Sequence, residues 1–500
     1  MTDDTTPPTN LQEPAKKPGV DIDALLVKYN AREEIVDRNG EVIGIKWILP
    51  NLGELIYNEF GYYFFTLEDN EEIYCYNGSF YEPNGEHNIR TMVEEILGET
   101  TTEHHKNEVT GYIRDKRYIK RETLNPPIHL LNLHNGILDL NDYTLQPHSP
   151  EYFFVNELPL NYDPNASYER FDGFVKHISM KEGNIRQEIV DTIQEYLGYS
   201  LLQCYPFKYY IVLDGGGDNG KTVLLTVVVA LIGANNNTSV SLQELNDRPF
   251  AKAQLYAKYT NVSDDLPKKA LKHTGVIKQI TGNSPMWADI KNHKKGINFV
   301  NYAKPWYACN ELPETNDYTD AFFSRQIQIT LLNKYLPKGD PKINGVNIFE
   351  RNVNLSNELT ELEQLSGILN YALIGLKRLQ ENKNFTDPTS TEEKRNTWLR
   401  KTNPIVAFLE EECEIGSDDW CITKDDFYSE VSYYCERNGF DKPTSQKYVT
   451  ERILDAGLGI KKQQKTINGE PRTWCWIGVR CTTNTVINYN LGELKQQVIL

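Results

Sequence analysis

Hydrophobic and aromatic residues in the first 200 positions change their spacing along the chain. Aromatic runs at 62–65 and 73–76 are typical of strands, and Asn77-Gly78 directly afterwards is a hairpin-turn signal. Between 168 and 202, hydrophobic residues recur three and four positions apart, which is the spacing of a helix. The pattern therefore predicts a mixed α+β region followed by a helical segment.

The middle of the chain alternates short β-prone runs with helical ones. A strand is expected at 209–213, followed by a glycine-rich turn and an apolar helix at 223–232. The alternation continues to 336, and a long helix is expected at 355–379. Strands that alternate with helices predict an α/β core with a parallel sheet.

The last hundred residues show three helical runs followed by a hairpin. The helices are expected at 404–413, 424–438 and 445–456. Two strands then flank Asn468-Gly469, which is a hairpin-turn signal. Three helices and a hairpin predict a C-terminal winged helix, which would meet DNA through basic residues of its third helix and hairpin, Arg452 of that helix among them. The alternative is a protein-docking module with a solvated hairpin.

These patterns divide the chain into six parts, with a short polar linker over 383–391. The expected parts are a disordered tail (1–20), a mixed α+β region (21–125), a mostly helical segment (126–203), an α/β core (204–382), a winged-helix domain (392–485) and a C-terminal tail (486–500).

Composition narrows the classes of function. The chain has 500 residues, 39% of them hydrophobic, and a formal net charge of −17. Because the overall charge is negative, nucleic acid would have to bind at a local basic patch or a pore lining. The eight cysteines lack zinc-knuckle spacing, and the sequence predicts neither a signal peptide nor a membrane span. We expect reduced thiols, the cytoplasm of a host cell and no membrane partner.

An eight-residue motif carries the strongest chemical signal. Glycines let backbone N–H groups curl around phosphate oxygens, and the helix that follows points its positive end at the same anion. Lys221 is expected to reach the β and γ phosphates of ATP, and the Thr222 hydroxyl to coordinate Mg²⁺. The motif therefore predicts an α/β P-loop core of the AAA+-like kind. It matches G-x-x-x-x-G-K-[ST] in full: Gly215, Gly216, Gly217, Asp218, Asn219, Gly220, Lys221 and Thr222.

Carboxylates and an amide follow two later strands. Asp264 and Asp265 end a β-prone run at the point where a P-loop enzyme needs an acidic partner for Mg²⁺ and the attacking water. Asp264 is the expected metal ligand, and which of the two aspartates is the catalytic base stays open. Asn310 follows a further strand. It is a candidate to orient the water against the γ phosphate, and the alternative is that it opens a turn.

Basic residues supply the remaining candidates. Arg325 precedes a β-like run and is a candidate arginine finger for a neighbouring subunit's nucleotide, or else an ordinary surface arginine. A basic loop in the core could grip DNA phosphates inside a ring, although charge runs are more often solvated turns. The candidates for contact with DNA are Lys291, His293, Lys294 and Lys295 in this loop, and Lys461, Lys462 and Lys465 in the C-terminal hairpin.

The order of these motifs resembles superfamily 3 helicases. A Gly-x-Gly-x-Asn-Gly-Lys-Thr loop precedes an acidic pair, a Thr281-Gly282 turn before the basic loop, an Asn-Glu-Leu-Pro turn and a late arginine. The chain is similar to the phage and plasmid primase-helicase family, which is related to the poxvirus primase-helicase. Segments at 135–139, 148–153 and 161–164 also resemble that family, so the likeness runs from about 130 onward.

The resemblance implies a hexameric ring that hydrolyses ATP and moves on single-stranded DNA at an origin or fork. Carried over, Asp264 and Asp265 take the acidic-pair position, Asn310 the water-sensing position and Arg325 the finger. The pair is Asp-Asp, where many relatives end in Glu. Too few residues precede the family-like region for that family's primase domain. We therefore expect no primase activity, and a separate primase is a candidate partner.

Three functions fit a P-loop protein of this kind. The first is an ATP-dependent DNA helicase or translocase that replicates a virus, plasmid or integrated element. The second is a replication initiator or loader, in which ATP only switches assembly. The third, a small-molecule kinase, is disfavoured by the late arginine, the basic loop and the DNA-type C-terminal domain.

Overall fold

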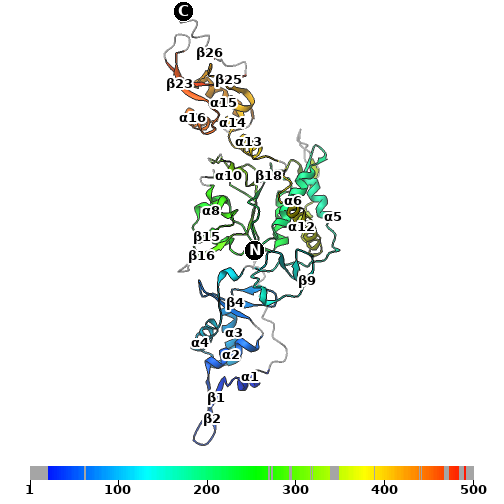
Figure 1. Cartoon of the computed structure of the whole chain (residues 1–500), viewed down its shortest axis with the longest axis vertical. Coiled ribbons are helices and arrows are strands. Elements are labelled where there is room, and N and C mark those ends of the chain that lie inside the picture. The colour runs from blue at the N-terminus through cyan, green and yellow to red at the C-terminus, as the bar shows by residue number, and fades with distance from the viewer. Residues whose placement is uncertain are drawn as a thin grey trace, which may run out of the picture.

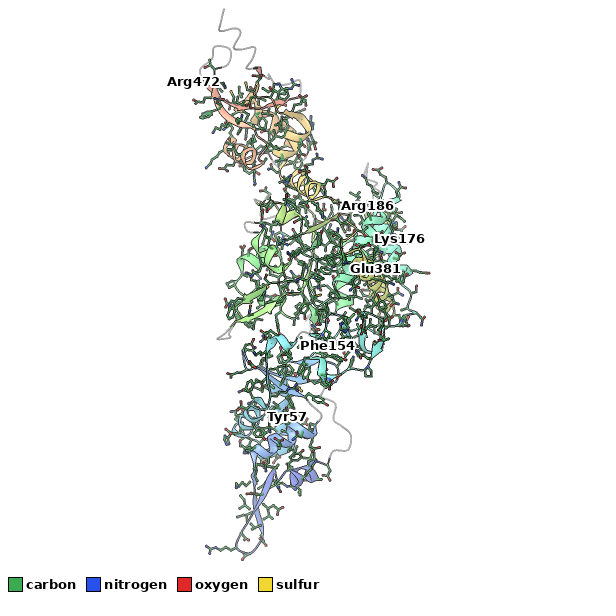
Figure 2. The ribbon with its side chains drawn as sticks, viewed as in Figure 1. Tyr57, Phe154, Lys176, Arg186, Glu381 and Arg472 are labelled. Atoms are coloured by element: carbon green, nitrogen blue, oxygen red, sulfur yellow. The ribbon has the colours of Figure 1, made fainter. Side chains whose placement is uncertain are left out.

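The structure, a computed structural model, describes residues 21–490 apart from 61–62, 125, 268–270, 272–273, 292–295, 316, 318, 338–347, 388, 439, 441, 467–471 and 483–488. The predicted tails therefore lie outside the described residues, except for 489–490. Three units follow one another along an elongated molecule, with the parallel sheet in the central unit (Figure 1). Side chains fill all three units, and Phe154 lies where the N-terminal and central units meet (Figure 2).

The N-terminal unit is mixed α+β, as predicted. The aromatic runs form β3 and β4 of a sheet with the order β5-β4-β3-β6, and Phe64 packs with Leu52 and Val93 from the helices. Asn77-Gly78 lies in the turn between β4 and β5. The elements are α1 (Ile22–Lys28), β1 (Arg32–Val36), β2 (Val42–Trp47), α2 (Leu49–Glu59), β3 (Phe64–Leu67), β4 (Ile73–Tyr76), β5 (Tyr81–Glu82), α3 (Gly85–Leu97), α4 (Glu103–Arg114) and β6 (Tyr118–Ile119).

Residues 130–203 begin with strands, so the prediction of a mostly helical segment over 126–203 is wrong for its first part. Leu130–Leu133 is fully buried, and so short a buried run cannot be told from a helix by its spacing. The expected helices follow as α5 and α6. The elements are β7 (Leu130–Leu133), β8 (Gly136–Asp139), β9 (Leu145–Gln146), α5 (Glu169–Ile178), β10 (Met180–Lys181), β11 (Asn184–Ile185) and α6 (Gln187–Tyr199).

Five parallel strands form the central sheet, in the order β13-β14-β17-β12-β18. A mixed α/β core with a parallel sheet was predicted and is confirmed. Two antiparallel strands, β15 and β16, form a hairpin beside it. The strands are β12 (Tyr210–Asp214), β13 (Asn237–Thr238), β14 (Thr260–Ser263), β15 (Pro285–Ala288), β16 (Ile297–Val300), β17 (Lys304–Cys309), β18 (Gln326–Thr330), β19 (Lys334–Leu336) and β20 (Ile348–Glu350).

Neighbouring residues of a strand point to opposite faces of a sheet, and elements pack on both faces of the central sheet. Ile211 and Leu213 of β12 pack with the helices α6, α7 and α12, whereas Tyr210 and Val212 pack with α8, α9 and the β15–β16 hairpin. Figure 1 shows α6 and α12 on one side of the sheet and α8 on the other. The helices are α7 (Lys221–Ile232), α8 (Leu242–Asp247), α9 (Gly275–Ile280), α10 (Asp320–Phe323), α11 (Leu355–Leu359) and α12 (Leu362–Asn382).

The C-terminal unit contains the three predicted helices and a sheet of order β23-β24-β22-β26. The predicted hairpin strands are β23 and β24, which pair antiparallel, while the turn Asn468-Gly469 lies outside the described residues. The elements are α13 (Thr391–Thr402), α14 (Pro404–Glu412), β21 (Cys413–Ile415), β22 (Trp420–Thr423), α15 (Lys424–Asn438), α16 (Gln446–Asp455), β23 (Lys461–Lys465), β24 (Thr473–Ile477), β25 (Val479–Cys481) and β26 (Tyr489–Asn490).

The segment predicted as a polar linker over 383–391 is packed in its middle and exposed at 383–384 and 390. Phe385 is buried beside Tyr196 and Tyr199, and Thr386 donates to the buried carboxylate of Glu195. Phe385 and Thr386 therefore hold this stretch against α6. A mostly polar composition did not reveal these contacts. In the described part of the chain, no helix is long and apolar enough to cross a membrane.

Candidate active site

The glycine-rich turn joins β12 to α7 at the carboxyl edge of the sheet. Gly220 has φ +89°, which a side chain would strain, and it begins α7 without a side-chain cap. A Cβ on Gly215 would lie 2.6 Å from the Leu331 carbonyl oxygen, so no larger residue fits there. The N–H groups of the first turn of α7 are therefore open toward the loop, and this arrangement attracts anions.

Lys221 points back across the turn, and its side chain is largely buried. Its ammonium donates to the Gly215 carbonyl at 2.6 Å, to Asn219 Oδ1 at 3.0 Å and to Asn310 Oδ1 at 3.2 Å. Burial lowers the pKa of Lys221 below its usual value, although nearby acidic groups oppose this. These bonds connect the loop to Asn310, which lies at the end of β17.

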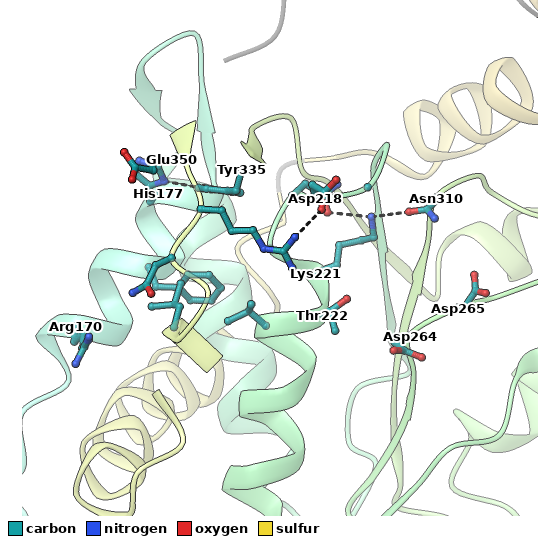
Figure 3. A pocket seen from close by; sticks show the side chains of 18 residues that line it. Arg170, His177, Asp218, Lys221, Thr222, Asp264, Asp265, Asn310, Tyr335 and Glu350 are labelled. Atoms are coloured by element: carbon teal, nitrogen blue, oxygen red, sulfur yellow. Dashed lines mark hydrogen bonds and ion pairs between the residues drawn. The ribbon is translucent and has the colours of Figure 1, made fainter. Parts of the chain in front are cut away.

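The acidic pair lies at the same edge of the sheet. Asp264 and Asp265 directly follow β14, and β17 lies between β14 and the loop-bearing strand β12. Asn310 therefore stands between the loop and the acidic pair (Figure 3). Both aspartates are exposed.

One cavity of about 590 Å³ connects most of these groups. Of the predicted site residues, it is lined by Gly217, Asp218, Asn219, Gly220, Lys221, Thr222, Asp264, Asp265 and Asn310. Gly215 and Gly216 form the start of the turn and do not line the cavity. The volume falls in the range of sites that hold a whole small molecule.

The donor set fits a nucleotide triphosphate with its metal. A lysine, a hydroxyl and exposed carboxylates meet at the start of a helix, and Mg²⁺ prefers such oxygen ligands together with phosphate oxygens. Within the described residues, no three His, Cys, Asp or Glu side chains form a metal cage. A metal here would therefore depend on Thr222, on Asp264 and on the phosphates of its nucleotide.

Arg325 lies away from this cavity, at the opposite edge of the sheet. Its carbonyl accepts from the Tyr210 N–H at 2.8 Å, where β12 begins. Four residue steps along β12 separate that point from Asp214, which is roughly 13 Å. Arg325 Nε is buried and finds no acceptor in the part of the chain that the structure describes. The structure therefore does not bring Arg325 together with the nucleotide site of its own chain.

The basic residues predicted to contact DNA lie in two places. Lys291 is exposed after β15, at the end of the β15–β16 hairpin. Lys461 and Lys462 are exposed on β23 and Lys465 is half-buried; Lys461 pairs with Asp418 at 2.9 Å. The remaining predicted residues, His293, Lys294 and Lys295, lie outside the described residues.

Sequence reasoning missed how the C-terminal unit reaches the site. Lys401 of α13 pairs with the buried Asp214, directly before the glycine turn. Trp398 is fully buried and donates to the Pro313 carbonyl at 3.0 Å, three residues after Asn310. Arg452 of α16 was predicted to face DNA, but it pairs with Glu314 of the central unit. Nothing in the sequence signals contacts between residues so far apart.

Sequence reasoning also missed one wall of the cavity. Arg170, Phe174 and His177 reach it from α5, and Tyr335 reaches it from β19. Glu350 and Arg351 line it where β20 ends. These side chains come from separate segments and form no motif.

Comparison with known proteins places these features in a wider context. Residues 53–179 match the family described as "D5 N terminal like". Residues 213–325, which include the glycine turn, the acidic pair and Asn310, match a family of unknown function (DUF5906).

A protein of Acanthamoeba polyphaga mimivirus, named as a helicase, is 22% identical over 302 residues, covering 55% of this chain and 30% of that protein. The chain therefore spans about a third of the length of this curated relative. The apo structure of the NrS-1 C-terminal region (305-718) is 12% identical with a TM-score of 0.46, covering 87% of this chain and 100% of the other. A second apo form of that region is 11% identical with a TM-score of 0.41, covering 85% and 98%.

The fold and the site define a mixed α/β protein with a glycine turn at the carboxyl edge of a parallel sheet. The family match and the viral relative confirm the resemblance drawn from the motifs. The chain is a protein like the phage and viral primase-helicases.

Proposed function

We propose that this chain is an ATP-dependent DNA helicase or translocase that acts in the replication of a virus, plasmid or integrated element. In this proposal the central unit is a superfamily 3 P-loop core of the AAA+-like kind, and the C-terminal unit is a winged helix. The convergence of Lys221, Asn310 and the acidic pair on one cavity carries the proposal, because together they are what ATP hydrolysis requires.

Each site residue has a role in the proposed hydrolysis. Lys221 exchanges its bonds with Gly215 and Asn219 for the β and γ phosphates. Thr222 and Asp264 hold Mg²⁺, which neutralises charge on the transferring phosphate. One aspartate of the pair polarises the attacking water, and Asn310, already bonded to Lys221, orients that water.

Arg325 completes the site of a neighbouring subunit in this proposal. It lies at the edge of the sheet opposite its own cavity, so it cannot act within its own chain. A finger supplied by a neighbour couples hydrolysis to assembly, because the site works only in a ring. The mimivirus relative, named as a helicase, supports an activity of this type.

Single-stranded DNA is the proposed partner, held by local basic groups on a chain of net charge −17. The exposed Lys291 follows β15 of the β15–β16 hairpin, and the sequence that joins the two strands is basic. The ribbon of β23 and β24 supplies Lys461, and Lys462 lies 4.6 Å from the ring centroid of Trp474. An aromatic ring beside a lysine suits stacked bases and phosphates.

DNA-stimulated ATP turnover tests the proposal. We expect single-stranded DNA to raise the rate of ATP hydrolysis several-fold, and ATP with DNA to raise the particle mass to that of a ring. Light scattering would measure the mass. An ATP-switched initiator or loader would assemble with ATP but hydrolyse no faster with single strands, and that outcome would favour the second candidate function. Absence of ATP hydrolysis under every condition would reject both.

The basic loop has its own test. Lys294→Ala with Lys295→Ala is expected to weaken single-strand binding and to flatten its salt dependence by roughly one unit of slope for each lost phosphate contact. Lys28→Ala with Lys46→Ala is the matched control, since both lysines are exposed on the N-terminal unit. Equal effects in the two double variants would remove the loop from the DNA path.

A further inference from the structure

The cavity extends well beyond the glycine turn in the direction away from Asn310. Figure 3 shows Lys221 and Thr222 in the middle, the acidic pair and Asn310 on one side, and His177, Tyr335 and Glu350 on the other. The phosphate-binding groups therefore occupy only one part of the cavity of about 590 Å³. The opposite part, formed by α5 with β19 and β20, contributes none of the groups that the hydrolysis mechanism uses.

The rings of His177 and Tyr335 line this second part, and Phe349 packs against both of them. The His177 and Phe349 ring centroids are 4.3 Å apart, and Tyr335 stacks with Phe349 at 5.9 Å. The Tyr335 hydroxyl and His177 Nδ1 form a hydrogen bond of 2.7 Å, which fixes both rings. Burial lowers the pKa of His177, which favours the neutral imidazole. This side of the cavity is therefore aromatic, with Arg170, Glu350 and Arg351 beside the rings.

The aromatic part is connected rigidly to the glycine turn. The Tyr335 N–H donates to the Asp218 carbonyl at 2.7 Å, and Arg351 pairs with the Asp218 carboxylate at 3.5 Å. The Arg351 N–H also donates to the Leu336 carbonyl at 2.9 Å. These bonds place β19 and β20 directly against the loop, so one ligand can contact the rings and the loop together.

We propose that α5, β19 and β20 form the nucleobase end of the site, with Tyr335 and His177 as the aromatic surface for the base. This inference rests on the proposed function and adds the direction in which the nucleotide lies, with its base toward α5 and its γ phosphate toward Asn310. A triphosphate needs no aromatic surface, whereas a base gains from ring contact. The exposed Glu350 carboxylate lies at the rim and can accept from a base amino group.

ATP and inorganic tripolyphosphate both carry phosphates, but only ATP carries a base. Comparing the two ligands therefore tests the two ends of the cavity separately. Tyr335→Ala is expected to raise the KM for ATP roughly 10-fold, with kcat changed less than about 2-fold, because base contact is lost and the catalytic groups remain. Inorganic tripolyphosphate, assayed as a competitive inhibitor, carries no base. Its inhibition constant should be unchanged in Tyr335→Ala. Because Lys221→Ala is expected to hydrolyse too little ATP for an inhibition assay, tripolyphosphate binding to that variant is measured by titration calorimetry, and its dissociation constant should rise.

Conservative and distant variants control for folding. Tyr335→Phe keeps the ring and should keep the KM for ATP within about 2-fold, because stacking needs the ring and not the hydroxyl. Tyr433→Ala removes an exposed tyrosine of the C-terminal unit and should leave both constants unchanged. Thermal unfolding of each variant reports on intact structure.

Two results would overturn the inference. One is an unchanged KM for ATP in Tyr335→Ala; the other is an equal weakening of ATP and tripolyphosphate, which would place the tyrosine in loop support instead of base contact. Failure of the proposed function itself gives a different result, because the unaltered chain would then hydrolyse no ATP.

Discussion

Two buried lysines lie at opposite edges of the central sheet, one in the proposed nucleotide site and the other away from it. Lys221 lies at the carboxyl edge and is 6% exposed, and Lys304 lies at the amino edge, where β17 begins, and is 0% exposed. Each ammonium donates to backbone carbonyls, Lys221 to that of Gly215 and Lys304 to those of Leu202 and Cys204. Burial lowers the pKa of both, and that of Lys304 falls to about 7.

The difference lies in what each lysine faces. Lys221 also bonds Asn310 and opens into the large cavity, whereas Lys304 lies 4.8 Å from the Tyr199 ring centroid and 5.5 Å from that of Tyr205. The larger pKa shift therefore belongs to the lysine that lines no part of this cavity. Burial and a lowered pKa are therefore common to both lysines, and only the cavity with its further polar groups distinguishes Lys221 as the candidate for nucleotide binding.

The largest expected effect is a loss of ATP hydrolysis without a loss of stability when Lys221 is replaced. Lys221→Ala is expected to reduce the rate of ATP hydrolysis more than about 10³-fold, because phosphate charge loses its main cationic partner. Its thermal midpoint should stay close to that of the unaltered chain. Steady-state hydrolysis and calorimetry measure the two quantities. Normal turnover in this variant would remove the nucleotide site from the carboxyl edge.

The amino edge also carries Arg325, whose loss should matter only across subunits. Arg325→Ala is expected to reduce turnover about 10³-fold, because the neighbour's site loses its finger. Mixing Arg325→Ala subunits with Lys221→Ala subunits should restore activity at about a quarter of the interfaces, since each intact pair joins one subunit of each kind. Failure of the mixture to exceed either variant alone would contradict action between subunits.

Asp264 and Asp265 at the carboxyl edge have two different proposed roles, that of metal ligand and that of catalytic base. Asp264→Asn and Asp265→Asn are each expected to reduce kcat roughly 10²-fold or more. The variant that lacks the metal ligand should also need more Mg²⁺ for half-maximal rate, whereas the variant that lacks the base should not. Mg²⁺ titrations of both variants assign the roles. If neither Mg²⁺ curve moves, neither aspartate holds the metal.

The smallest expected effect is a pH dependence of stability at the amino edge. The pKa of Lys304 is about 7 in the folded chain and near the ordinary lysine value of 10.5 when the chain is unfolded. Between these two pKa values the unfolded chain binds more protons than the folded chain, so the free energy of unfolding rises with pH. Below about pH 7 both states are protonated, and the whole cost of burying the charged lysine lowers the stability of the fold. From pH 7 to 8.5 this contributes about 1.5 kcal/mol.

Lys304→Met should lose that contribution. Urea midpoints at pH 7 and 8.5, compared between the variant and the unaltered chain, measure it. Equal changes in the two proteins would mean that Lys304 stays charged in the fold, held by its two carbonyl contacts.

The sequence predicted the parts of the site that lie in continuous segments. The glycine turn is a single run, and Asp264, Asp265 and Asn310 each follow a strand, so their meeting at one edge follows from the parallel order. The strands of 130–146 were missed because short buried runs lack a distinctive period. Their existence depends on pairing with one another, as β7 does with β8.

The aromatic end of the cavity could not be predicted in the same way. His177 and Tyr335 are separated by 158 positions, and only the docking of α5 against β19 brings them together. Arg452 looked like a DNA-binding residue because its helix is basic, yet Glu314 takes its charge. Local composition gives the charge of a side chain, and the tertiary fold determines its partner.

Residues of α13 and α16 connect the C-terminal unit to the ends of β12 and β17, the two strands that precede the glycine turn and Asn310. Lys401 holds the end of β12, while Trp398 and Arg452 hold the turn that follows β17. Arg395 of α13 also pairs with Asp320 of α10, so several contacts hold the C-terminal unit against the central unit. If β23 and β24 bind DNA as proposed, a force on the DNA would be transmitted through these contacts to the glycine turn and to Asn310. In the other direction, a movement of the glycine turn during ATP hydrolysis would be transmitted to the DNA.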